Sequence, residues 1–178
     1  MISNVVTNGI NGVPNIPGDK SISHRSIIIP SISNGICKVK NILKSDDVLH
    51  TLEAFKDMGV EIIENKDEII INGKGLNSLK KPRKDIYLGN SGTSARLLVG
   101  LLSAQKFNSK IIGDSSLSKR PMKRITDPLT KMNAIIKTSN GSLPIEIQGG
   151  NLTSADIDIS IPSAQIKSGI LLACINTE

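Results

Sequence analysis

The stretch NSGTSARLLVGLLSAQ, residues 90–105, contains the pattern on which the rest of the chain is built. A small polar turn around Gly92 passes into an apolar run, which predicts a helix entered through this turn. Arg96 falls in the first helical turn. Backbone N–H groups at a helix start, together with a cation, favour a carboxylate or a phosphate. Taken alone, however, the stretch fits a tight strand-to-helix turn equally well, and it lacks the spacing of a P-loop.

The same arrangement occurs three times. GDKSISHR at 18–25 precedes the apolar SIII, and PSAQIKS at 162–168 precedes GILLACI. The cations Arg25, Arg96 and Lys167 are separated by 71 residues in both intervals. Equal spacing of a cation behind small polar turns predicts an internal repeat.

Strand and helix patterns alternate between these turns. Apolar alternation predicts strands, and apolar residues on one helical face predict helices. Gly59 and Asn133 close two of the helices, as residues that tolerate a left-handed conformation do. Pro30 is expected to end or kink the first helix early. The expected strands are 36–42, 68–71, 109–113, 143–150 and 156–161, and the expected helices after the first are 45–59, 90–105, 120–133 and 163–175.

The order of elements predicts an α/β (α+β) chain. The strand and turn EIIINGKG recur 75 residues later as LPIEIQGG. The plan is a polar turn, a helix, a strand, a helix and two strands, given twice and started a third time. We therefore expect units at about 18–88 and 89–161, and a truncated unit at 162–178. Either the chain is a fragment or the rest comes from elsewhere, and the apolar last helix needs a covering surface.

Composition narrows the function classes. Aromatic residues make up 2% of the chain and tryptophan is absent, which argues against a protein that stacks nucleic-acid bases. The net charge of +6 favours anionic partners, whether nucleic acid, a membrane surface or small phosphorylated metabolites. The only cysteines, Cys37 and Cys174, lie far apart without metal-ligand spacing, so reduced thiols in a cytoplasmic protein are expected. The sequence shows no signal peptide and no apolar stretch long enough to span a membrane.

Four polar turns are candidate ligand sites. Each could also be a plain cap or a solvated basic loop. His24 is expected to be a packing or supporting residue. If the turns converge, their cations and hydroxyls suit a ligand with several anionic groups and several hydroxyls. The turns are PGDKSISHR (17–25), LGNSGTSARLL (88–98), GDSSLSKRPM (113–122) and SAQIKS (163–168).

In this order, the four motifs resemble 5-enolpyruvylshikimate-3-phosphate synthase (3-phosphoshikimate 1-carboxyvinyltransferase). The resemblance implies an inside-out α/β barrel of βαβαββ units, of which this chain holds the N-terminal part. It implies transfer of the enolpyruvyl group of phosphoenolpyruvate to the 5-hydroxyl of shikimate 3-phosphate, a step in aromatic amino acid biosynthesis. It also implies no metal, no organic cofactor, no nucleic-acid or membrane partner, and a complete enzyme that is monomeric.

The resemblance assigns site residues by motif. It implies that Lys20 contacts both substrates and has a part in proton transfer. The shikimate 3-phosphate site would consist of Lys20, Ser21, Arg25, Ser163, Ala164 and Gln165. The phosphoenolpyruvate site would consist of Lys20, Gly92, Arg120 and Gln165. The main acid–base carboxylates belong to the other domain of the family, so this chain is expected to be inactive alone.

Some positions depart from the family pattern. Alanine is usual where Ser26 stands, Pro30 is unusual, and some members have proline where Leu97 stands. Gly92 is retained, which implies that a complete enzyme with this half is inhibited by glyphosate. The alternative function is a non-catalytic basic module that binds RNA or another polyanion, for which steep salt dependence is expected.

Overall fold

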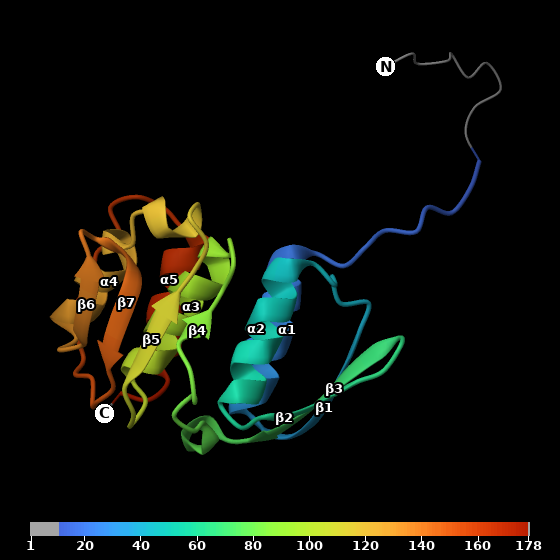
Figure 1. The fold of residues 1–178 in the computed structure, drawn as a ribbon, viewed down its shortest axis with the longest axis horizontal. Helices are drawn as coiled ribbons and strands as arrows, with labels where there is room; N and C mark the ends of the chain where they lie inside the picture. Colours follow the sequence, from blue (N-terminus) through green and yellow to red (C-terminus); the bar gives the residue numbers. More distant parts are fainter. Residues whose placement is uncertain (1–10, 178) are drawn as a thin grey trace, which may run out of the picture.

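The computed structural model describes residues 11–177, and its elements form two groups side by side, each of which is a sheet with its own helices (Figure 1). Short 3₁₀ turns η1 (Leu76–Ser78) and η2 (Leu117–Lys119) lie in the connections. In chain order the helices and strands are α1 (Lys20–Ile32), β1 (Asn34–Lys40), α2 (Asp46–Asp57), β2 (Glu61–Glu64), β3 (Glu68–Lys74), β4 (Ile86–Tyr87), α3 (Gly92–Ser103), β5 (Ser109–Ile112), α4 (Lys123–Lys131), β6 (Ile135–Ser139), β7 (Ser142–Gln148) and α5 (Ala164–Cys174).

Three strands of each sheet follow the same order. The first has the order β1-β3-β2, and β3 pairs antiparallel with both neighbours. The second has the order β4-β5-β7-β6, in which β7 is antiparallel to β5 and β6 while the short β4 runs parallel to β5. Thus β5, β7 and β6 repeat the arrangement of β1, β3 and β2. This agrees with the internal repeat of the sequence.

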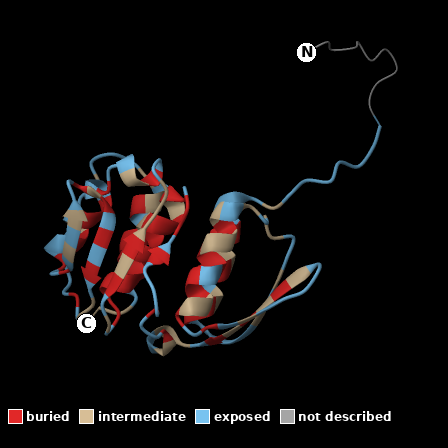
Figure 2. Cartoon of the chain, in the orientation of Figure 1, coloured by how far each residue is buried: buried red, intermediate tan, exposed pale blue. Residues whose placement is uncertain are grey.

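Period-two burial is clearest in β3 and β7, each of which lies between two neighbouring strands. Ile69 and Ile71 of β3 are buried, and so are Ile145 and Ile147 of β7, while the residues between them are more exposed. Figure 2 shows the alternation of buried and exposed residues along β7. One face of each sheet can therefore cover helices while the other meets solvent.

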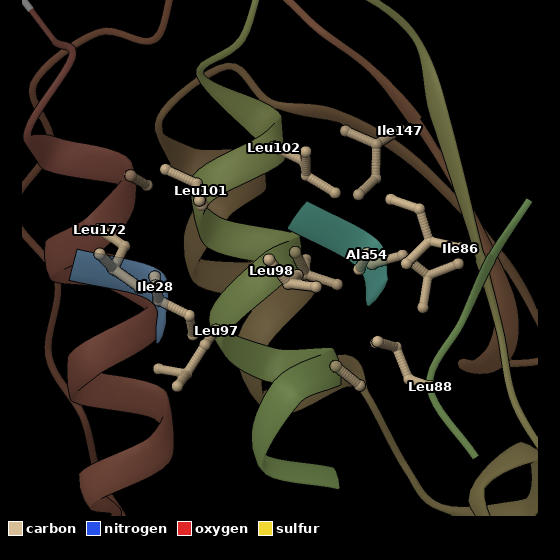
Figure 3. Packing of buried hydrophobic residues seen from close by; sticks show 14 of the residues in the cluster. Ile28, Ala54, Ile86, Leu88, Leu97, Leu98, Leu101, Leu102, Ile147 and Leu172 are labelled. Carbon is tan, nitrogen blue, oxygen red and sulfur yellow. The ribbon is translucent and has the colours of Figure 1, made fainter. Parts of the chain in front are cut away.

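Helix α3 is the centre of the core. Its leucines are buried on two sides of the helix. Figure 3 shows Leu97 and Leu101 on the side of α5, and Leu98 and Leu102 on the side of the strands, where Ile86 lies. Apart from Thr93 and Arg96, every residue of α3 is buried. The helix begins at Gly92, so both of these residues lie near its N-terminal end.

The structure confirms several predicted elements. The predicted helix 45–59 corresponds to α2, and 90–105 corresponds to α3. Gly59 and Asn133 have φ values of 87° and 65°, so both adopt the left-handed conformation expected of helix ends. The expected mixed α/β class is also correct.

Other expectations were wrong. Residues 156–161 form no strand, although Ile157 and Ile159 pack against the core. Helix α1 continues to Ile32, two residues beyond Pro30, so the proline does not terminate it. The predicted helix 120–133 begins only at Lys123, since the backbone of Arg120 is extended, with a ψ of 135°.

Helix α5 finds its covering surface on α3 and α4. Leu171 and Ile175, each 55% exposed, remain on its outer side. The division into three βαβαββ units and the inside-out barrel stay predictions. None of the helices within residues 11–177 is long and apolar enough to cross a bilayer.

Candidate functional site

Three helices of the repeat begin with equivalent caps. The side chain of Asp19 accepts the N–H of Ile22 at the start of α1, at 2.8 Å. Ser91 caps α3 in the same way, and Ser163 caps α5. Each cap satisfies one backbone donor and leaves other first-turn N–H groups for a ligand. Three of the four predicted turns are therefore capped helix N-termini, whereas the turn 113–122 contains η2 and leads to α4 without a side-chain cap bond.

Gly92 lies against two guanidinium groups. A β-carbon built on Gly92 would lie 2.7 Å from Nη1 of Arg96 and 3.0 Å from Nη1 of Arg120. Arg96 also donates to the carbonyl of Gly92 at 2.9 Å, and Arg120 donates to the side-chain oxygen of Asn90. Only glycine lets both arginines approach the backbone this closely.

Helix α5 joins this cluster through Gln165. Its side-chain oxygen accepts from Nη1 of Arg96 at 3.2 Å, and its amide nitrogen donates to Thr93 Oγ1 at 3.0 Å. Ser163 and Ala164 are the cap and first residue of the same helix. The structure thus brings the predicted residues Gly92, Arg120 and Gln165 together around Arg96.

Arg25 repeats the geometry of Arg96. Its Nη1 donates to the carbonyl of Ser21, four residues earlier, at 3.1 Å, just as Arg96 bonds the carbonyl of Gly92. Its Nη2 donates to Ser168 Oγ of α5 at 2.9 Å. Both arginines therefore reach from the second turn of their helix to the first turns of α5, and their equivalent geometry agrees with the 71-residue repeat.

Lys20 occupies the first position of α1 and its side chain is 50% exposed. Its amine pairs with the carboxylate of Asp47 on α2. Within the described residues it makes no hydrogen bond to the Gly92 cluster. Lys20 and Ser21 thus form a second, open part of the site beside the arginines.

The link between the two parts is the buried His24. Its Nδ1 lies 2.9 Å from Thr51 Oγ1 and 3.1 Å from Ser94 Oγ, and its Nε2 lies 3.4 Å from Ser91 Oγ. Burial, and next the charge of Lys20, lower the pKa of His24 to about 4, with Asp47 opposing and Arg25 adding to the shift. The imidazole is therefore neutral at pH 7. The expectation that His24 is a packing residue is confirmed by its burial, and its supporting role stays a prediction.

Within residues 11–177, the arginines of the site have no carboxylate partner. Every ion pair that residues 11–177 form has a lysine as its cation. Burial lowers the pKa of Arg96, and the neighbouring charges of Arg120 and Arg124 lower it further. Positive charge held together without a counter-ion is suited to an anionic ligand.

Several members of this cluster were not among the predicted site residues. Arg96 was visible as a repeated cation, but the sequence assigned it no ligand. Asn90, Thr93 and Ser168 carried no separate signal, because their roles depend on helices that meet only in the fold. Among residues 11–177, no group of three or more His, Cys, Asp or Glu side chains could hold a metal ion.

The chain is similar to known proteins along nearly its whole length. Residues 6–178 match the family model described as EPSP synthase (3-phosphoshikimate 1-carboxyvinyltransferase). The 3-phosphoshikimate 1-carboxyvinyltransferase of Ruthia magnifica subsp. Calyptogena magnifica is 54% identical over 94% of this chain and 39% of its own. That of Oceanobacillus iheyensis is 47% identical over 97% of this chain and 41% of its own.

A solved structure agrees with these relatives. The EPSP synthase of Acinetobacter baumannii matches with a TM-score of 0.91 and 51% identity, over 94% of this chain and 38% of that one. The chain thus spans about two fifths of the length of the proteins it matches. With four motifs, a repeated fold and a convergent cationic site, the chain belongs to the EPSP synthase (3-phosphoshikimate 1-carboxyvinyltransferase) family.

Proposed function

We propose that this chain supplies the shikimate 3-phosphate site and part of the phosphoenolpyruvate site of an enolpyruvyl transferase. In the overall reaction, the 5-hydroxyl oxygen of shikimate 3-phosphate bonds to the central carbon of phosphoenolpyruvate while the methylene carbon gains a proton. The resulting tetrahedral intermediate then loses phosphate and a proton, which gives 5-enolpyruvylshikimate 3-phosphate.

The first substrate would bind between α1 and α5. Arg25 presents a planar fork that suits the shikimate carboxylate, while the hydroxyl of Ser21 bonds the ring hydroxyls. Ser163 and the backbone of Ala164 lie at the N-terminus of α5, where N–H groups favour the 3-phosphate. Gln165 completes the wall between the two substrates.

Phosphoenolpyruvate would bind beside Gly92. Arg120 would hold its anionic groups, and the backbone near Gly92 allows close approach. Lys20 would contact both substrates, exchange its pair with Asp47 for the incoming anion, and take part in proton transfer. Arg96 bonds the carbonyl of Gly92, the side chain of Gln165 and the carbonyl of Pro121, and so would hold the backbone on both sides of the ligand.

The single observation that carries this proposal is that Arg96 and Arg120 meet at Gly92 while Arg25 and Arg96 both reach α5, and that none of the three pairs with a carboxylate of residues 11–177. Partly buried guanidinium groups that have no carboxylate partner are available to bind an anionic ligand. The main acid and base are expected in the part of the longer relatives that this chain does not span. The chain is therefore expected to bind substrate but not to turn it over.

Isothermal titration of the chain with shikimate 3-phosphate tests the proposal. We expect binding by the wild type and a loss of at least tenfold in affinity for Arg25→Ala, because a charge-assisted bidentate contact is removed. Arg83→Ala, at an exposed arginine in the loop before β4, is the matched control and should bind as the wild type does.

Three results would contradict parts of the proposal. Absence of heat at millimolar ligand would mean that this chain does not form the shikimate site by itself. Equal weakening by Arg25→Ala and Arg83→Ala would mean that binding follows net charge, as expected for a module that binds polyanions. Turnover by the isolated chain would refute the assignment of acid–base chemistry to the rest of the family protein.

A further inference from the structure

The two parts of the proposed site are joined by a buried polar network that neither substrate would touch. Its members are one imidazole and three hydroxyls, and they come from three helices: His24 of α1, Thr51 of α2, and Ser91 and Ser94 at the start of α3. All four side chains belong to residues that are at least 97% buried. The network therefore sits beneath the surface that carries Lys20 and Gly92.

The spacing of the network on α1 and α2 is regular. Lys20 and His24 are four residues apart on α1, and Asp47 and Thr51 are four residues apart on α2. Residues at this spacing lie one turn apart on the same helix face. Lys20 pairs with Asp47, and His24 bonds Thr51 one turn deeper. Thr51 Oγ1 also lies 3.2 Å from the carbonyl oxygen of Asp47, an alternative acceptor for its one hydroxyl proton, so the buried pair lies next to the exposed one.

The network then passes to α3. Thr51 Oγ1 lies 2.6 Å from Ser94 Oγ, and Ser94 Oγ lies 2.8 Å from Ser91 Oγ. Ser91 is also the cap of α3, since its oxygen accepts the N–H of Ser94 at 3.2 Å. The residue that follows Ser91 is Gly92, against which Arg96 and Arg120 lie.

A neutral imidazole can close this network into a ring. Nε2–H donates to Ser91, whose hydroxyl donates to Ser94, whose hydroxyl donates to Thr51, whose hydroxyl donates to Nδ1. Every hydroxyl then donates once and accepts at least once, so no polar side-chain atom of the network itself is left unsatisfied. The imidazole favours its neutral form because it is buried. The positive charges of Lys20 and Arg25, which together outweigh the negative charge of Asp47, act in the same direction.

We propose that His24 is a positioning residue that holds the Lys20 turn of α1 in register with the Ser91–Gly92 turn of α3. This inference rests on the proposed function, in which phosphoenolpyruvate contacts both turns. Shikimate 3-phosphate, by contrast, spans α1 and α5, which the network does not join. Loosening the network should therefore weaken the binding of phosphoenolpyruvate more than the binding of shikimate 3-phosphate.

The test uses mild hydroxyl deletions with a matched control. Thr51→Val and Ser94→Ala remove members of the ring. Ser103→Ala removes a hydroxyl that is equally buried on α3 but bonds only the carbonyl of Val99, at 2.7 Å. All three should lower thermal stability to a similar degree. Only the first two should weaken the binding of phosphoenolpyruvate, by about tenfold, while the affinity for shikimate 3-phosphate should change by less than threefold.

Two further measurements keep the result decisive. In ¹⁵N-labelled chain without ligand, Ser94→Ala should shift the amide resonances of Lys20 and Ser21 on α1, and Ser103→Ala should not. The amide of His24→Asn can reach the Nδ1 position, so its affinity for phosphoenolpyruvate should be within threefold of that of the wild type. The affinity of His24→Ala should be at least tenfold lower.

The outcomes separate this inference from the proposed function. If the wild type binds both ligands and Ser94→Ala behaves as Ser103→Ala does, the positioning role is wrong and the substrate assignment stands. If the wild type binds neither ligand, the substrate assignment fails for this chain, and the amide shifts alone decide the register. Shifts confined to α3 would then overturn the inference.

Discussion

Gly100 of α3 and Gly169 of α5 bring the two helix backbones into contact. A β-carbon built on Gly100 would lie 1.9 Å from the carbonyl oxygen of Gly169, and one built on Gly169 would lie 2.6 Å from the carbonyl oxygen of Arg96. No side chain fits between the helices at this point. The contact fixes the first turns of α5, so that Gln165 meets Arg96 and Ser168 meets Arg25.

Replacing Gly100 by alanine should therefore separate α3 from α5. We expect the free energy of unfolding to fall by about 1–3 kcal/mol, the usual cost of overpacking a rigid core. Urea denaturation followed by circular dichroism measures this. Gly150→Ala is the control, because a β-carbon there would have no atom within 4 Å. Equal stability of the two variants would mean that the helix contact is not tight in solution.

Replacing Gly92 by alanine should act on binding rather than on folding. The new β-carbon would meet Nη1 of Arg96 and of Arg120 at 2.7 and 3.0 Å, and flexible side-chain ends can move away at small cost. Since Arg120 would then leave its position, we expect affinity for phosphoenolpyruvate to fall about tenfold. Titration of both substrates measures this, and an unchanged phosphoenolpyruvate affinity would remove Gly92 from that site.

The buried imidazole of His24 predicts a pH dependence of stability. Its pKa is about 4 in the folded chain against an ordinary value of 6.5, so the unfolded chain binds the extra proton first. The contribution of the neutral imidazole to the free energy of unfolding is fully present above pH 6.5. It is lost as the pH falls from 6.5 to 4, by about 3 kcal/mol in total.

The measurement is urea denaturation of the wild type and His24→Asn between pH 7 and pH 5. Asparagine does not titrate, so the variant should lose less stability over this range. Parallel curves for the two proteins would mean that His24 is accessible to protons in the folded state. An imidazole titration by NMR would locate its pKa directly.

The helix caps predict a contrast between Asp19 and Ser45. Asp19 accepts a backbone N–H of α1 at 2.8 Å, so Asp19→Ala should cost about 1 kcal/mol of stability. Ser45 precedes α2 but makes no side-chain cap bond, and its buried hydroxyl has no partner among the described residues. Ser45→Ala should thus be close to neutral. Thermal unfolding of both variants compares them, and equal losses would contradict the cap assignment.

Much of the fold was predictable because the patterns are local. The apolar face of α2 and the left-handed ends at Gly59 and Asn133 follow from residues that are neighbours in the chain. The alternation DIDISI at 156–161 misled for the same reason. Alternation shows that two faces differ, but a strand also needs a partner with free backbone groups, and residues 156–161 form no strand pairing.

The sequence by itself determined the mixed α/β class, the repeat of 71 residues and the four polar turns, because spacing and residue type encode local structure. Only the tertiary structure decided that Arg96 is the centre of the cationic cluster and that His24 joins α1, α2 and α3. It also decided that Gly100 and Gly169 fix the position of α5 on α3 through a close backbone contact. These relationships depend on distances between helices, and such distances follow from how buried surfaces pack rather than from any single stretch of the chain.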